Sequence, residues 1–153
     1  MLNGRIPSLV GFIALLVASP LVAAPADVVA SRIAGLRELG AAYKNVNDQL
    51  KSGTPQMFLV QLSARQIREK SRDQYGWFPA GSGPQPGIKT RAKPDIWAQP
   101  AQFKAAQDAF AAQANAFYQA AASGDAARIG MQARQLGQSC AACHRQFRVD
   151  ERE

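Results

Sequence analysis

The sequence contains only one histidine, His144, and two cysteines, Cys140 and Cys143. Coordination of one metal by two histidines is therefore impossible within a single chain. A structural zinc site takes four ligands, and this sequence offers only these three soft donors, without a second cysteine pair. The few metal-ligating residues are also adjacent, so any cofactor that uses them must bind at one place.

Long apolar runs are equally scarce. The one uninterrupted run, residues 9–18, follows Arg5 and is too short to span a bilayer. With small residues up to Ala26, this pattern is typical of a secretory signal peptide. We expect residues 1–26 to be removed, no stable membrane anchor, and a single exported domain over residues 27–153.

The chain also lacks any dense run of basic residues. The sequence has 18 basic and 11 acidic side chains, a formal net charge of +7, and the basic residues form no dense run. A net positive charge can favour binding to nucleic acid, to an acidic partner protein or to an anionic membrane surface. An exported protein rarely meets nucleic acid, so we expect a solvated basic surface and no nucleic-acid partner.

No strand-like alternation persists after residue 27, and apolar residues instead recur at spacings of three and four, which predicts helices. We expect a second helix from Thr54-Pro55 to about Tyr75, a third after Pro100, and a boundary at Gly124-Asp125. The predicted fold is an all-α, up-down-up-down four-helix bundle with a long loop, residues 76–100, between the second and third helices. The expected apolar stripes are Val29, Ile33, Leu36, Tyr43, Val46 and Leu50; Met57, Val60, Ala64 and Ile67; Phe103, Ala106, Phe110, Ala114, Phe117 and Ala121; and Ile129, Ala133, Leu136, Cys140, Cys143 and Phe147.

Cys140, Cys143 and His144 form a C-x-x-C-H motif on the expected fourth helix, where positions i, i+3 and i+4 share a face. This motif is typical of c-type haem, in which the cysteines add across two vinyl groups and the histidine ligates the iron. A redox dithiol would be expected near a βαβ pattern, which is missing. A disulfide would close a very short loop and leave the histidine unexplained. We therefore favour covalent haem, with all three side chains pointing into the bundle.

The sequence also resembles the cytochrome c′ family, periplasmic haem proteins with a four-helix bundle. The resemblance rests on CAACHRQFR at the end of the chain, PDIWAQPAQF (residues 94–103), FPAGSG (residues 78–83), and Arg32 followed four residues later by Leu36. It implies a periplasmic protein with one haem c, five-coordinate and high-spin iron on His144, and binding of NO and CO. It also implies a homodimer through the first two helices, and surplus apolar residues on the second helix (Phe58, Leu59 and Leu62) favour the same assembly.

In this topology the haem lies at the end of the bundle that holds the start of the first helix. The residues expected to contact the cofactor there are Arg32, Leu36, Tyr75, Phe78, Phe103 and Arg148. Arg32 could pair with a haem propionate, and Arg148, one turn after His144, should flank the proximal side. The resemblance places Leu36 over the open face of the iron, where low-spin relatives have a ligating methionine.

No sixth iron ligand is evident. Met57 should lie at the far end of the bundle, and Met131 is thirteen residues before His144 on one helix, about 20 Å away along its axis. We interpret both methionines as core residues, and Lys70 remains a possible unusual ligand. The favoured function is a gas-binding cytochrome that also exchanges electrons with a periplasmic partner. A six-coordinate low-spin electron carrier is the alternative, and a peroxidase-like enzyme is disfavoured because no distal acid or base can be placed.

Overall fold

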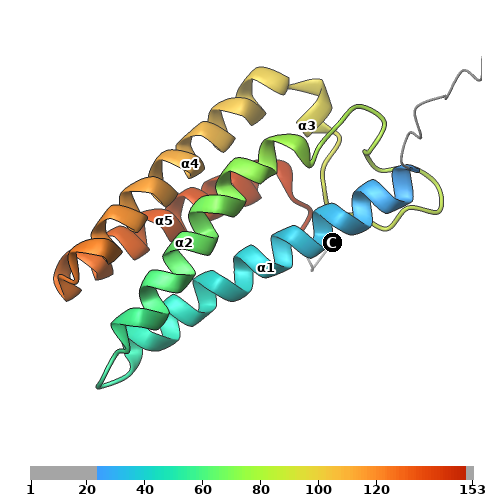
Figure 1. Cartoon of the computed structure of the whole chain (residues 1–153). Coiled ribbons are helices and arrows are strands. Elements are labelled where there is room, and N and C mark those ends of the chain that lie inside the picture. Colours follow the sequence, from blue (N-terminus) through green and yellow to red (C-terminus); the bar gives the residue numbers. More distant parts are fainter. Residues whose placement is uncertain (1–23, 151–153) are drawn as a thin grey trace, which may run out of the picture.

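The computed structural model describes residues 24–150 and consists of helices joined by loops (Figure 1). The elements are α1 (Pro25–Lys51), α2 (Met57–Asp73), the short 3₁₀ helix η1 (Gln74–Gly76), α3 (Asp95–Ala98), α4 (Pro100–Ser123) and α5 (Ala126–Phe147). Successive long helices run antiparallel, with α1 packed on α2, α2 on α4 and α4 on α5. The predicted all-α four-helix bundle with a long loop between its second and third long helices is therefore confirmed.

The helix boundaries follow from local sequence chemistry. Pro100 starts α4, where a missing N–H costs nothing. Gly124 ends α4 in the left-handed conformation, with φ of 72°, which glycine adopts without steric cost. The Asp125 carboxylate then accepts hydrogen bonds from the backbone N–H groups of Ala127 and Arg128 at 2.9 and 3.1 Å. This N-cap starts α5 as the sequence predicted.

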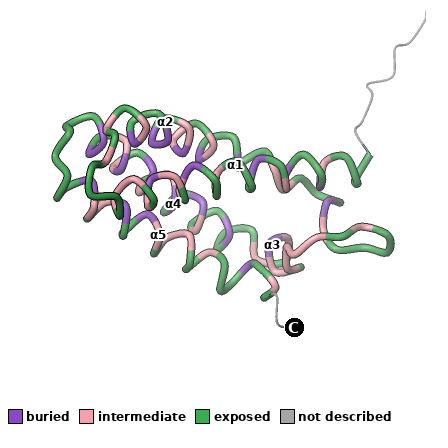
Figure 2. Tube along the Cα trace, turned by 90° about the horizontal axis from the view of Figure 1, so that it is seen from below, coloured by how far each residue is buried: buried purple, intermediate pink, exposed green. Residues whose placement is uncertain are grey.

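The central core fills the middle of the bundle and is formed by the apolar stripes of the four long helices (Figure 2). Its fully enclosed side chains include Val46, Val60, Ile67, Phe117, Ile129 and Leu136. A second group, the loop-end cluster, lies where the long loop meets α4 and α5. It consists of the buried Ile96, Phe103 and Phe147 with the half-buried Phe78, Ala92, Trp97, Ala106 and Cys143.

The structure corrects two boundaries that the sequence suggested. Helix α2 begins at Met57, since the carbonyl of Gln56 accepts the first helical hydrogen bonds, from Leu59 and Val60. Thr54-Pro55 is thus not its cap. The long loop is also not irregular throughout, because Asp95–Ala98 forms α3.

Two apolar residues of the chain that were expected on inward stripes or in the core are partly exposed. Leu36 is 39% exposed, because the inward positions of that part of α1 are taken by Arg32 and Gly35. Met131 is 44% exposed, because it is out of phase with the buried Ile129 and Ala133 on α5. The interpretation of Met131 as a core residue was therefore wrong.

Within residues 24–150, no helix is both long enough and apolar enough to cross a bilayer. The expected signal segment, residues 1–26, falls mostly outside the described residues, which begin at 24.

Candidate functional site

The two cysteines lie on the last turns of α5, on the side that faces the bundle. Cys140 packs against the central core and Cys143 against the loop-end cluster. Both thiols are unpaired. Burial, together with the neighbouring Cys143, raises the pKa of Cys140 to about 11, and burial also raises the pKa of Cys143. At neutral pH both sulfurs are therefore protonated thiols, held about one helical turn apart on α5.

His144 is exposed, which differs from the expected inward orientation. One turn further along the chain, Arg148 places Nη1 3.5 Å from Nδ1 of the imidazole. Partial desolvation of the otherwise exposed ring, followed by the charges of Arg148 and Arg91, lowers the pKa of His144 below its ordinary value. The imidazole is therefore neutral at pH 7 and keeps a nitrogen lone pair for a metal.

Aromatic side chains from three parts of the chain meet beside Cys143. The ring of Phe103 on α4 makes edge-to-face contacts with Phe78 of the long loop, at 4.8 Å between centroids, and with Phe147 of α5, at 5.1 Å. Trp97 of α3 lies 6.4 Å from Phe78. The structure therefore brings the predicted residues Phe78 and Phe103 together next to one of the two thiols, on an apolar surface that suits a flat hydrophobic cofactor.

Arg32 on α1 is 2% exposed and anchors the long loop. Its guanidinium donates to Ser82 Oγ, the Ser82 carbonyl and Thr90 Oγ1, each at 3.1 Å, and to the Trp77 carbonyl at 3.4 Å. It also lies over the Phe78 ring, 4.8 Å from the centroid. Burial lowers the pKa of Arg32. All its hydrogen-bond acceptors are thus neutral, and no ion pair to a described acidic residue balances its charge.

A cavity of about 420 Å³ opens beside Arg32, between the first turns of α1 and the start of the long loop. Its wall includes Ser31, Arg32, Trp77 and Pro79. The indole of Trp77 also packs on Gly35, where a Cβ atom would lie 2.6 Å from the ring. Gly35 was missed by the sequence analysis, although it lies one turn from Arg32 on the same face of α1.

Two other predicted residues are partly exposed and belong to neither apolar cluster. The hydroxyl of Tyr75, a side chain that is 44% exposed, donates to Asp108 Oδ1 on α4 at 2.7 Å. Leu36 belongs to neither apolar cluster. Lys70, the possible unusual ligand, places Nζ 2.7 Å from Glu38 Oε2, in an ion pair that links α2 to α1.

The methionines are not near the C-x-x-C-H motif. Met57 packs against the central core at the first turn of α2, which lies at the opposite end of the bundle from the long loop. Met131 is on the outward side of α5. Neither thioether is placed to meet a metal bound at His144.

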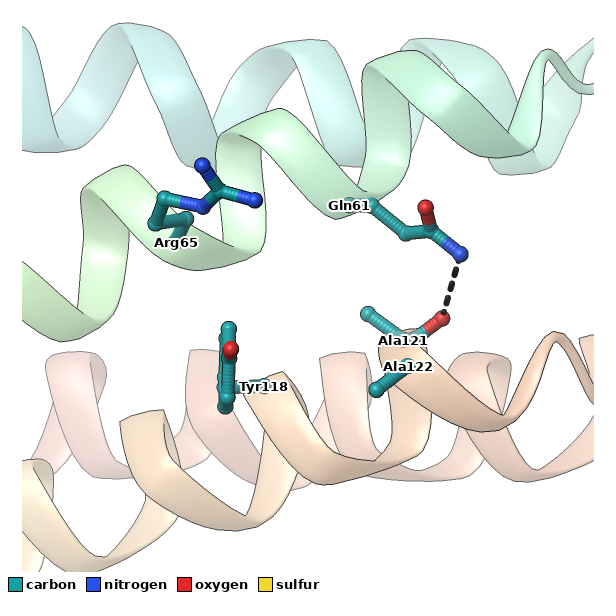
Figure 3. Close-up of a pocket in the computed structure, with 5 residues that line it drawn as sticks. All are labelled: Gln61, Arg65, Tyr118, Ala121 and Ala122. Carbon is teal, nitrogen blue, oxygen red and sulfur yellow. Dashed lines mark hydrogen bonds between the residues drawn. The ribbon is translucent and has the colours of Figure 1, made fainter.

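A second cavity, of about 190 Å³, lies between α2 and α4 (Figure 3). Gln61 and Arg65 line it from α2, and Tyr118, Ala121 and Ala122 form its other wall. It contains none of the predicted site residues, so it is separate from the site at the end of α5.

The donor set fits a covalently attached haem. Two reduced thiols one turn apart, followed directly by a neutral imidazole, supply the groups that c-type attachment requires. The adjoining aromatic surface and the enclosed cation of Arg32 suit the apolar ring and the anionic propionates. Residues 24–150 contain no cluster of three His, Cys, Asp or Glu side chains that could hold a bare metal ion.

Comparison with known proteins agrees with this chemistry. The family model described as Cytochrome C′ matches residues 27–148. The chain belongs to the cytochrome c′ family. A cytochrome c′ from Pararhodospirillum photometricum is 32% identical over 127 residues, which are 82% of this chain and 99% of the relative. One from Rubrivivax gelatinosus is 40% identical over 68 residues, so the match spans 44% of this chain and about half, 53%, of that relative.

Solved cytochrome c′ structures share the fold. The crystal structure of cytochrome c′ from Thermochromatium tepidum matches with a TM-score of 0.78 at 24% identity, over 84% of this chain and 98% of the other. At that identity the likeness establishes the fold alone. Membership of the cytochrome c′ family makes this a haem c protein.

Proposed function

We propose that Cys140 and Cys143 hold one haem c through thioether bonds and that His144 Nε2 is the only protein ligand to its iron. The bound group would supply a one-electron Fe(III)/Fe(II) couple and an open coordination site for a small diatomic gas such as NO or CO. The chain's own residues hold the ring, exclude water from one edge and set the charge around it.

The observation that carries this proposal is the lack of a second iron ligand in the described chain. His144 is the only histidine. Met57 is packed in the core at the other end of the bundle, Met131 faces outward, and Lys70 is paired with Glu38. This lack of a second ligand supports a five-coordinate iron, which can bind a gas and still change oxidation state.

Relatives support the gas-binding part. A variant of the cytochrome c′ from Alcaligenes xylosoxidans forms a nitric oxide complex, and its chain is 24% identical to this one. Arg32 supports the cofactor part, because its enclosed charge has no described acidic partner and a propionate would supply one. We place the protein in the periplasm with an unidentified redox partner there, and we assign it no enzymatic reaction.

The test is a visible absorption spectrum of the oxidised and reduced holoprotein, combined with haem staining of a denaturing gel. A high-spin reduced spectrum and a stained band at the protein's mass are expected. Sharp low-spin α and β bands would favour the six-coordinate electron carrier. Loss of all haem on extraction with acid and acetone would contradict covalent attachment. The matched control is the double variant Cys140→Ser and Cys143→Ser, whose gel band should not stain for haem.

The second proposal is a homodimer through α1 and α2. On α2, Phe58 is 73% and Leu62 50% exposed, while Leu59 between them is half-buried. A bundle helix normally leaves its outer face polar, so this apolar surface should be covered by a second copy of the chain. Another cytochrome c′, 21% identical to this chain, shows ligand-controlled dimer dissociation.

A further inference from the structure

The chain that follows α5 pairs with the long loop. The Lys93 N–H donates to the Phe147 carbonyl at 2.9 Å, and the Val149 N–H donates to the Arg91 carbonyl at 2.8 Å. Between these bonds Ala92 and Arg148 form an isolated antiparallel bridge. The loop therefore holds the last residue of α5 and the two residues that follow it, Arg148 and Val149.

Arg91 strengthens this pairing with its side chain. Its Nε and Nη2 both donate to the Val149 carbonyl, at 3.1 and 2.9 Å. Arg91 therefore accepts from Val149 through its backbone and donates to it through its guanidinium. The planar fork of arginine can place two donors on one oxygen, whereas a lysine ammonium cannot reproduce that geometry.

Arg148 lies between the two residues that these bonds hold. Its backbone N–H donates to the His144 carbonyl at 3.0 Å, and its Nη1 lies 3.5 Å from His144 Nδ1. If Nε2 ligates iron and Nδ1 carries the proton, both facing groups are donors. Arg148 then acts on the imidazole through its positive charge and not through a hydrogen bond.

We propose that Arg91 is a positioning residue for the haem site: by holding Val149, it keeps the Arg148 cation beside the proximal imidazole and so raises the reduction potential of the iron. This role rests on the proposed attachment of haem at Cys140, Cys143 and His144. A fixed positive charge near the iron disfavours Fe(III), which carries one more positive charge than Fe(II), and therefore favours the reduced state.

A double-mutant cycle on the holoprotein separates positioning from direct charge. Midpoint potentials are measured by spectroelectrochemical titration for Arg91→Ala, Arg148→Ala and the double variant, with Lys89→Ala as the control for losing one exposed loop cation. In Arg91→Ala, the ratio of oxidised to reduced protein at a fixed solution potential should rise several-fold, and in Lys89→Ala it should barely change. In the Arg148→Ala background most of the Arg91→Ala effect should disappear.

Additive effects of the two substitutions would overturn the proposal, because Arg91 would then act through its own charge. An unchanged potential in Arg91→Ala would overturn it as well. If the wild-type protein shows no haem stain on a denaturing gel, the proposed function itself fails, and the role of Arg91 fails with it. The two failures are therefore distinguishable by the haem stain.

Hydrogen exchange of the C-terminal peptide, measured by mass spectrometry on the same holoproteins, gives a readout independent of the iron. Exchange at the Val149 amide should be at least several-fold faster in Arg91→Ala than in wild type, with Arg91→Lys between them because one donor is retained. Equal protection in wild type and Arg91→Ala would show that the side chain does not hold the tail, and would overturn the proposal.

Discussion

Replacement of Arg32 by alanine should destabilise the holoprotein more than any single surface substitution. Three of its hydrogen bonds are 3.1 Å long and the fourth is 3.4 Å. A hydrogen bond from a charged donor contributes about 1.5 kcal/mol, so the three shorter bonds contribute roughly 4–5 kcal/mol. Stacking on Phe78 adds about 1 kcal/mol.

Desolvation opposes these contributions. The guanidinium is enclosed, and removing a buried cation from water costs several kcal/mol, which the alanine variant avoids. The variant instead leaves the buried acceptors of Ser82 without their donor, a penalty of about 1–3 kcal/mol. The value for each hydrogen bond already includes exchange with water, so desolvation and the abandoned acceptors overlap with it, and we expect a net loss of about 3 kcal/mol in the free energy of unfolding.

The assay is urea unfolding of the oxidised holoprotein, followed by far-ultraviolet circular dichroism. Arg37→Ala is the matched control, since Arg37 is an exposed arginine on the same helix, and it should change the free energy by less than about 0.5 kcal/mol. Arg32→Lys keeps the charge but loses the fork and should recover only part of the loss. A change below about 1 kcal/mol in Arg32→Ala would refute the reasoning, because the anchored loop would then contribute little to stability.

Three further outcomes are expected. Gly35→Ala should destabilise the protein because the added Cβ would meet the Trp77 indole ring at 2.6 Å. Gly40→Ala, where nothing lies within 4 Å of the added Cβ, should instead stabilise it by about 0.5–1 kcal/mol. Urea unfolding measures both, and equal changes in the free energy of unfolding would contradict the prediction. Leu36→Ala should speed CO association in flash photolysis, and an unchanged rate would mean that Leu36 does not guard the iron. The variant with Phe58→Asp and Leu62→Glu should sediment as a monomer at micromolar concentration where the wild type is a dimer; a monomeric wild type would contradict the assembly.

The helices were predictable because their apolar residues recur with the helical period. The stripe of α4 from Phe103 to Ala121 is buried apart from the half-buried Ala106, and Asp125 caps α5 as its sequence position indicates. Residue spacing alone was enough to predict these helices, since the apolar stripe of each helix packs against the apolar stripes of its neighbours. The motif at the end of α5 was predictable for a different reason, which is that its chemistry is contained within five adjacent residues.

The haem end was less predictable, because its contacts join residues far apart in the chain. Arg32 reaches residues 45 to 58 positions later, and no periodicity reveals such a partner. The apolar stripe of α1 was also one position out of phase there, since Arg32 and Gly35 are buried beside the predicted stripe residues Ile33 and Leu36. Helix α3 was missed because four residues are too few to show a period.

The long loop connects α1 to the end of α5 at one end of the bundle. The start of α1 and the end of α5 diverge there, and the loop with α3 lies at the same end of the bundle (Figure 2). Arg32 of α1 holds its first half at Ser82, and Arg91 in its second half holds the chain after α5. The loop is therefore a bridge between the helix that carries Leu36 and the helix that carries His144. Substitution of Arg32 or Arg91 should therefore change the structure around both Leu36 and His144. A free linker of the same length would not couple these two helices.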